Sequence, residues 1–476
     1  MQRPAKTFLS RISHQFGGLL KAAGTHLGYK EAGVSTSQSP RLQVLSACTG
    51  CSAESFVLKG LRIDFDILSA SESNTEYQKF ILANHSEHFK HLHETVEKQL
   101  KPTGPCVICA KNGTSCEDFS RQVQFQADIM VTGSPCDPFS VQRAKRFQCG
   151  AVKDHVAYRI TMSSVIDMYC KYGPHVGVLE QVMGFTYPLD TTTDETPYQR
   201  FLQLFAAAPL QHGGYYVVKL ALDAKIWLRI SRPRCFLVLF RKDKFSKEHV
   251  KRFKTMVEAL SGWIQQNHTP RSLAEFLLEE SSPVFHEHWS QMLSQKAPVP
   301  TPVRGLPMWK VQSLKLRQNL GDSFQQLKPW TSAGFQLQGL GQNPRLLEVL
   351  DLAVIHYADK EIFQGSSSTL DVKQRLRESC LDLYTDVSQN PSRKAYTCRA
   401  TGVSKCLTTS SFVYGHARDR IILPLEQMLW QGHSLETKFP PSMPQSAIKS
   451  LSGEGICLPC LGLIFYALHH TDSLCV

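Results

Sequence analysis

The chain has 476 residues, 42% of them apolar, which is enough to bury a full core and a second, smaller lobe. Its 15 cysteines are an odd number spread along the sequence, which argues against a secreted disulfide framework and favours reduced thiols in an intracellular compartment. Lys and Arg number 53 against 41 Asp and Glu, and the resulting net charge of +12 favours partners that carry phosphates.

The first 40 residues form a basic extension. Five Lys or Arg residues precede Glu31, which is the first acidic residue of the chain. This composition is compatible with a disordered basic arm or with an organelle transit peptide. We expect residues 1–40 to be disordered or targeting, and folded structure to begin near Arg41.

Residues 41–244 alternate short apolar, β-prone runs with helical patterns, which is typical of a sheet covered by helices on both faces. The predicted strands are residues 43–46, 66–70, 127–132, 176–179 and 235–241. The predicted helices are residues 52–60, 76–100 and 157–171. An open α/β sheet is therefore the predicted fold of this part of the chain.

The sequence changes character after Lys244. Residues 245–267 are a basic helical stretch, and the segment that follows is rich in Pro, Gln, Gly and Ser. We expect a separate lobe over residues 245–395. Residues 396–476 regain apolar density, so we expect them to return and complete the sheet domain.

The most informative stretch is residues 128–140, with the sequence DIMVTGSPCDPFS. A buried strand is expected to end in a Gly-Ser-Pro turn that presents Cys136, with prolines on both sides that stiffen the loop. Ligands of open α/β sheets bind outside the carboxyl ends of the strands, where a thiol held in one geometry can attack a substrate. Taken alone, the loop fits a nucleophile and a half-buried structural cysteine about equally well.

The Gly-Ser-Pro-Cys sequence that ends at Cys136, followed by Pro-Phe-Ser, closely resembles the Pro-Cys motif of cytosine-C5 DNA methyltransferases. Further motifs stand in the order of that family. Residues 44–58, VLSACTGCSAESFVL, resemble its first cofactor motif, in which a strand ends in a glycine turn. Residues 69–72 resemble the second motif, whose acidic residue binds ribose hydroxyls. The resemblance covers residues 41–241 and 396–468.

The resemblance implies an α/β fold: a Rossmann-like sheet that binds S-adenosylmethionine, with helices on both faces and a smaller target-recognition lobe. It implies a catalytic domain at 41–244, the recognition lobe at 245–395 and final motifs at 396–476. S-adenosylmethionine is the expected methyl donor, and no metal is expected. The residues that it assigns to this cofactor are Ser46, Thr49, Gly50, Cys51, Glu72, Ser73, Asp118, Phe119, Pro135, Glu454, Gly455 and Ile456.

The resemblance also assigns the chemistry. Carbon C5 of cytosine is a poor nucleophile until a thiolate adds at C6, and Cys136 is expected to supply this thiolate. Glu180 is expected to share a proton with N3 and to read the Watson-Crick edge of the base. Arg234, supported by Arg232, is expected to hold O2 and to favour the thiolate electrostatically. The target base must leave its stack to reach these groups.

Five positions depart from the family pattern. The changes affect packing, secondary hydrogen bonds and contacts to the cofactor more than the chemical residues themselves. The substitution at position 454 places the negative charge of Glu454 near the cofactor pocket. This charge can repel the carboxylate of S-adenosylmethionine or attract its sulfonium. The substituted positions are Cys48, Ser52, Gln181, Ile230 and Glu454.

Two clusters offer metal ligands. Cys106 and Cys109 form a Cys-x-x-Cys pair with Cys116 nearby, but no second ligand pair stands at the usual zinc spacing, so we expect reduced loop thiols. Four histidines at 85, 88, 91 and 93 fall on the predicted helix 76–100 and lack the His-Glu-x-x-His arrangement, so we expect surface residues.

DNA is the expected partner, with RNA, as in the transfer-RNA branch of the family, as an alternative substrate. A catalytically silent relative that binds DNA or a partner methyltransferase is the alternative from another functional class. A DNA substrate implies residence in the nucleus, whereas a transit peptide would imply a chloroplast or mitochondrion. The longest apolar run, residues 456–468, is shorter than the roughly 20 residues that span a bilayer, so no membrane segment is expected.

Overall fold

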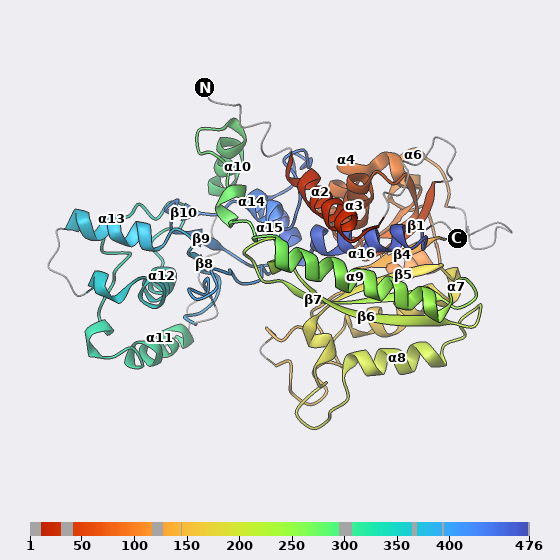
Figure 1. Ribbon diagram of the computed structural model, residues 1–476. Helices are drawn as coiled ribbons and strands as arrows, with labels where there is room; N and C mark the ends of the chain where they lie inside the picture. Colours follow the sequence, from red (N-terminus) through yellow and green to blue (C-terminus); the bar gives the residue numbers. More distant parts are fainter. Residues whose placement is uncertain are drawn as a thin grey trace.

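The computed structural model describes residues 11–29, 41–116, 127–143, 145–294, 307–363, 369–392 and 395–474. Its centre is a seven-stranded sheet in the order β3-β2-β1-β4-β5-β7-β6 (Figure 1). All neighbouring strands are parallel except β7, which runs antiparallel to β5 and β6. The strands are β1 (Leu42–Ala47), β2 (Phe65–Ser71), β3 (Leu92–His93), β4 (Ile129–Thr132), β5 (Val176–Val182), β6 (Tyr215–Asp223) and β7 (Pro233–Arg241).

Alternate side chains of the strands enter two separate apolar cores. In β5, Val176 and Val178 point into one core and Leu179 into the other, as the two-residue period of a strand requires. On the first face lie α2 (Arg11–His26), α3 (Ala53–Leu61), α4 (Thr75–His85), α9 (Lys247–Asn267) and α16 (Leu458–His470). On the second face lie α7 (Val165–Tyr172) and α8 (Pro197–Ala207). The predicted α/β sheet with helices on both faces is confirmed.

The helix predicted over residues 76–100 is wrong, because the chain breaks it into four elements. After α4 come the 3-10 helix η1 (Ser86–His88), the edge strand β3 and the short helix α5 (Val96–Leu100). Backbone pairing with β2 fixes β3, since Ala70 N donates to His91 O at 3.0 Å and Glu72 N to His93 O at 2.9 Å. A strand of two residues leaves no periodic signal in the sequence.

Folded structure begins before Arg41, contrary to expectation. Within the basic extension, α2 buries Phe16, Leu20 and Ala23, which recur at helical spacing and face α3, α9 and α16. The segment has the composition of a free arm because it contains few acidic residues. Its apolar stripe is nevertheless sufficient to pack it against the sheet domain.

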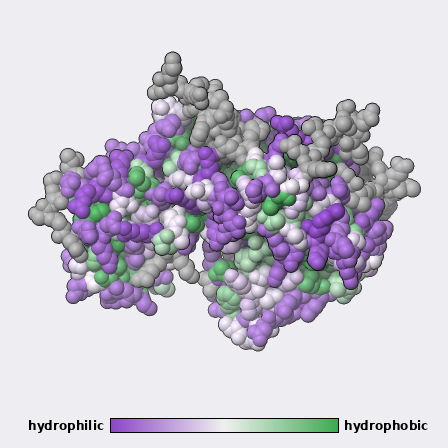
Figure 2. Space-filling model, in the orientation of Figure 1, coloured by the Kyte–Doolittle hydropathy of each residue, from purple (hydrophilic) through white to green (hydrophobic). Residues whose placement is uncertain are grey.

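A second lobe stands apart from the sheet (Figure 1). Its core includes Trp330, which stacks on Phe335 with ring centroids 3.7 Å apart. The face seen in Figure 2 is largely hydrophilic, and its lower outline is notched between this lobe and the sheet. The helices of the lobe are α11 (Met308–Gln318), α12 (Pro344–Tyr357) and α13 (Thr369–Ser379). Its small sheet has the order β10-β9-β8 and consists of β8 (Tyr384–Asp386), β9 (Val413–Gly415) and β10 (Arg420–Ile421).

The packing cuts across the expected lobe limits of 245–395. Helix α9 packs on the large sheet, where Phe253 and Leu260 enter the core of the sheet domain. Strands β9 and β10, in contrast, belong to the second lobe. Arg317 in the second lobe is buried and forms a bidentate ion pair with Glu348, in which the two N–O distances are 2.6 and 2.9 Å. The remaining helices are α6 (Val107–Asn112), α10 (Pro283–Ser294), α14 (Pro424–Leu429) and α15 (Gln445–Glu454).

Among the described residues, no single helix is long and apolar enough to cross a membrane. Helices α15 and α16 reach that length and composition only as a pair bent by 46°. The apolar residues of α16 are buried in the core of the protein.

Candidate active site

A cavity of about 290 Å³ opens at the carboxyl ends of β1, β2, β3, β4 and β5. Its volume lies at the lower end of the range for pockets that bind small molecules and cofactors. Its wall combines the loops that follow these strands with a segment between α15 and α16. The structure therefore has a cavity at the carboxyl ends of the parallel strands, where we expected a ligand site.

The loop after β1 forms the floor of this cavity. Three of its residues adopt left-handed backbone conformations: Cys48 with φ 52°, Gly50 with φ 56° and Ser52 with φ 55°. In Ser52, which stands where the family has glycine, the side chain donates to Ser55 Oγ at 2.8 Å. This local hydrogen bond helps a non-glycine residue to keep the left-handed turn.

Glu72 lies at the end of β2 and closes the floor. Its carboxylate accepts hydrogen bonds from Gly50 N at 2.8 Å and from Asn74 N at 2.7 Å. Each carboxylate oxygen has a further lone pair, so both can still accept from the hydroxyls of a ribose. Burial raises the pKa of Glu72. Beside it, the buried Ser71 Oγ lines the cavity and has no hydrogen-bond partner among the described residues.

The loop after β4 presents Cys136, which is half-buried and lines the cavity. Gln181 on β5 holds this loop, because its Nε2 lies 2.8 Å from both Ser134 O and Ser134 Oγ and 3.3 Å from Pro135 O. Thr161 Oγ1 donates to the same Ser134 hydroxyl at 2.9 Å. The substitution of Gln for the Asn of the family thus still connects β5 to the Pro-Cys loop.

We expect Gln181→Ala to lower the methyl-transfer rate proposed below by roughly 10- to 100-fold, as loss of a residue that orients a reactive group commonly does. The variant should fold, because the lost contacts lie at one loop. Initial rates with saturating methyl donor would measure the effect, and Gln181→Asn should recover part of the activity. An unchanged rate in Gln181→Ala would show that the loop holds its geometry without Gln181.

A buried arginine supports the far side of the same loop. Arg146 is 1% exposed and donates to three backbone carbonyls: Phe139 O at 3.1 Å, Leu189 O at 2.7 Å and Gly184 O at 3.0 Å. Five donors in a rigid plane suit such a junction better than a flexible lysine would. Sequence reasoning did not single out Arg146.

Glu180 and Arg234 form a buried ion pair in the cavity wall. Arg234 Nε lies 2.9 Å from Glu180 Oε1, and both side chains line the cavity with Cys136. The antiparallel pairing of β5 and β7 brings them together, because Glu180 and Arg234 emerge near the same end of the two strands. Burial raises the pKa of Glu180 despite the opposing effect of Arg234. A carboxyl group in this setting is suited to carry and donate a proton.

The thiol of Cys136 has a raised pKa in the free protein, although Arg234 favours the thiolate in the expected direction. Burial and the charge of Asp137 raise this pKa to about 11. A second thiol, Cys406, lies 3.8 Å from Arg234 Nη2 and 3.5 Å from Arg232 Nη1. These arginines lower the pKa of Cys406 against the effect of its burial.

A pH series tests this state of Cys136. Alkylation by iodoacetamide in the free protein should accelerate about tenfold per pH unit, because the thiolate reacts and its pKa lies near 11. Mass spectrometry of the peptide that contains Cys136 would follow the reaction, with the exposed Cys149 as an internal reference. A rate that levels off below pH 8 would contradict the raised pKa.

Arg232 does not reach the cavity. Its buried guanidinium donates to Gly453 O at 2.8 Å, Gly455 O at 2.7 Å and Leu407 O at 3.2 Å. It therefore positions the segment between α15 and α16, whereas we expected it among the catalytic residues. Nη1 and Nη2 of Arg232 are used by these carbonyls, whereas its buried Nε has no hydrogen-bond partner among the described residues. In the free protein Arg232 is therefore a positioning residue.

The last wall of the cavity comes from residues 453–456 and from Thr409. The backbone of Thr408 approaches Gly453 so closely that a β-carbon on this residue would overlap it. Glu454 has an exposed side chain that lines the cavity with Glu72, Glu94, Glu97 and Asp137. This acidic wall favours a ligand with positive charge.

The structure brings most of the predicted site residues to one cavity. Ser46 lies beneath the first loop, where it accepts a hydrogen bond from Thr49 Oγ1 at 2.9 Å. Asp118 and Phe119 lie outside the described residues. Sequence reasoning missed Ile160, Val182, Thr409 and the segment from Glu94 to Glu97, which follows the unpredicted strand β3. The predicted residues that line the cavity are Thr49, Gly50, Cys51, Glu72, Ser73, Pro135, Cys136, Glu180, Arg234, Glu454, Gly455 and Ile456.

The strand order, the single antiparallel strand β7 and the cavity at the carboxyl ends define a Rossmann-like methyltransferase fold. No protein-family model matches the chain, and no curated protein matches its sequence.

Three solved structures that resemble this chain are named as methyltransferases. The Dnmt2 methyltransferase of S. pombe is 14% identical with a TM-score of 0.45, and the match covers 90% of this chain and 99% of that one. A putative DNA modification methyltransferase of an E. coli prophage is 13% identical with a TM-score of 0.46, covering 90% and 98%. The Entamoeba histolytica methyltransferase EhMeth is 10% identical with a TM-score of 0.44, covering 90% and 99%. Similarity this low does not show what this chain does.

Proposed function

We propose that this chain is a DNA cytosine-C5 methyltransferase that uses S-adenosylmethionine and forms a covalent adduct through Cys136. The observation that carries the proposal is that Cys136 lines one cavity together with the ion pair of Glu180 and Arg234. A thiol, a carboxyl group with a raised pKa and a guanidinium are the groups that activation of a cytosine ring requires.

The part of the cavity lined by Glu72 fits S-adenosylmethionine. Glu72 offers free lone pairs to the ribose hydroxyls, and the unpartnered Ser71 Oγ offers a further hydrogen bond. The acidic residues around them, Glu94, Glu97 and Glu454, favour the sulfonium and the amino group electrostatically. The departure at Glu454 is therefore compatible with this cofactor, because its charge joins an existing acidic wall.

In the proposed reaction, the Cys136 thiolate bonds to C6 of cytosine and the C5–C6 π electrons form a C4–C5 double bond. The C4–N3 π electrons move to N3, which takes a proton from Glu180. Arg234 holds O2 and balances the charge of Glu180. When bound, S-adenosylmethionine would supply an electrophilic methyl group to C5 and would keep the electrons of the broken methyl–sulfur bond as a neutral thioether. The C4–N3 double bond re-forms as C5 bonds to the methyl carbon. Loss of the C5 proton to solvent then restores the C5–C6 double bond, expels the Cys136 thiolate and returns the N3 proton to Glu180.

The polymer is the finer part of the proposal. A cytosine reaches Cys136 only when it is rotated out of its stack, so a second lobe beside the cavity domain would hold the flanking nucleotides. The net charge of +12 supports binding of phosphates. With a DNA substrate we propose that the protein acts in the nucleus, whereas RNA remains the alternative substrate. A chloroplast or mitochondrion is the alternative location.

Transfer of labelled methyl groups from S-adenosylmethionine tests the proposal. Duplex DNA and transfer RNA are compared in parallel, and digestion to nucleosides identifies the labelled base. Label in 5-methyldeoxycytidine supports the proposal, whereas label only in 5-methylcytidine would replace DNA by RNA. Intact cofactor and DNA binding without transfer to either polymer would favour a silent binding protein instead.

A further inference from the structure

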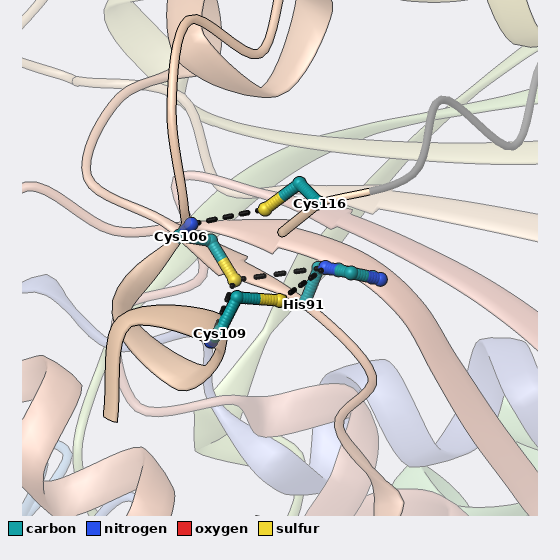
Figure 3. Close-up of side chains that lie close together, drawn as sticks. All are labelled: His91, Cys106, Cys109 and Cys116. Carbon is teal, nitrogen blue, oxygen red and sulfur yellow. Dashed lines mark hydrogen bonds between the residues drawn. The ribbon is translucent and has the colours of Figure 1, made fainter. Parts of the chain in front are cut away.

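A second cluster of reactive side chains lies outside the cavity (Figure 3). His91, Cys106, Cys109 and Cys116 place one ligand atom each within 4.8 Å of one another. The first three residues are buried and Cys116 is half-buried. The sequence suggested reduced loop thiols here, because no second ligand pair stands at the usual zinc spacing. His91 was expected on the surface of a helix instead. Its true position directly before β3 supplies the ligand that the Cys-x-x-Cys pair lacked.

The local fold prepares these groups. Cys106 is the N-cap of α6, and its sulfur accepts from Cys109 N at 3.5 Å, so both thiols of the pair lie at the start of one helix. Cys106 N in turn donates to Cys116 Sγ at 2.9 Å. Backbone N–H groups that point at sulfur stabilise thiolates, which is the form that binds metals.

The distances match a tetrahedral metal centre. His91 Nδ1 lies 3.6 Å from Cys106 Sγ and 3.3 Å from Cys109 Sγ. Zinc bonds of about 2.3 Å to sulfur and about 2.05 Å to nitrogen give a separation of roughly 3.6 Å between such ligands at the tetrahedral angle. Hydrogen bonds alone explain the arrangement poorly, because Nδ1 has a single lone pair and two thiols point at it.

We propose that His91, Cys106, Cys109 and Cys116 bind a structural zinc ion. Three thiolates and an imidazole are a ligand set that suits zinc, and a complete set of four protein ligands marks a structural site rather than a catalytic one. The proposal differs from the expectation that the chain binds no metal, and it concerns a structural ion only. It takes no part in the proposed methyl transfer.

The ion would fasten α6 to the edge of the sheet. His91 precedes β3, which pairs with β2 through Ala70 and Glu72, and the residues after β3 line the cavity. An edge strand with two residues has few hydrogen bonds of its own. A zinc ion at its start would therefore hold the wall that carries Glu94 and Glu97.

Metal analysis of the purified full chain tests this site. Protein prepared with reducing agent and without chelators should contain one zinc ion per chain. The double variant Cys106→Ser with Cys109→Ser should contain none and should melt at a temperature lower by roughly 5 °C or more. The matched variant Cys170→Ser changes a cysteine outside the cluster and should keep both the zinc and the melting temperature.

A variant that exchanges one metal ligand for another separates loss of the metal site from misfolding. His91→Cys should keep one metal ion and change the absorption bands of the Co²⁺-substituted protein, because a fourth thiolate replaces the imidazole, whereas His91→Ala should weaken metal binding. Reduced wild-type protein that takes up neither Zn²⁺ nor Co²⁺ would overturn the proposal. Retention of stoichiometric zinc by the double cysteine variant would do the same. Neither result depends on methyl transfer.

Discussion

Replacement of Cys136 by alanine is expected to abolish methyl transfer, with a fall in rate of at least about 10⁴-fold, because the proposed bond to C6 is formed by the Cys136 thiolate. Binding of S-adenosylmethionine should change little, since Glu72 and Ser71, rather than Cys136, are proposed to hold its ribose. Single-turnover transfer measures the first quantity and calorimetry the second.

Two controls separate this role from a structural one. Cys149→Ala removes an exposed thiol outside the cavity and should leave the rate unchanged. Cys136→Ser keeps the size of the side chain, yet it should be as inactive as the alanine variant because a hydroxyl is a far weaker nucleophile. Retention of a tenth or more of the activity in Cys136→Ala would exclude a covalent role for this residue.

Glu180→Gln is expected to lower kcat by about 10²- to 10⁴-fold, the usual contribution of a positioned acid. Glutamine keeps the shape and can still contact Arg234, but it cannot give a proton to N3. The variant Glu87→Gln, which alters an exposed pair with Lys59, is the matched control and should be as active as the wild type.

The pH dependence gives the second readout for Glu180. Burial raises the pKa of Glu180, so its protonated form is available at higher pH than in water and is lost as the pH rises through that value. The thiolate of Cys136 follows the opposite trend, since its pKa of about 11 means that it forms as the pH rises. The wild-type profile should therefore fall on its alkaline side, and Glu180→Gln should lose that fall. An alkaline limb that persists in Glu180→Gln would assign the proton donor to another group.

Sequence patterns were sufficient for the long buried strands and for the residues that follow them. Apolar runs such as the one in β5 are visible because both faces of a central strand are buried, and Cys136, Glu180 and Arg234 follow or lie on such strands. The two-residue strand β3 has no such pattern, so Glu94 and Glu97 were missed together with His91. Their position depends on backbone pairing with β2, which no local spacing reveals.

Charge was the least informative signal. Arg317 and Arg146 are both buried, and both donate to backbone carbonyls rather than to a phosphate or a substrate. Arg232 likewise satisfies carbonyls of a distant segment. The partner of a buried arginine is set by tertiary contacts across many residues, so its role follows only from the fold.

Covalent trapping tests the central claim most directly. The protein is incubated with S-adenosylmethionine and duplex DNA that carries 5-fluorocytosine, whose C5 substituent cannot leave, so that a nucleophile at C6 stays attached. The account predicts a denaturation-resistant adduct in which mass spectrometry finds the nucleotide on Cys136, and no adduct in Cys136→Ala. Full methyl transfer to unmodified DNA without any trapped adduct, or an adduct on another residue, would contradict it.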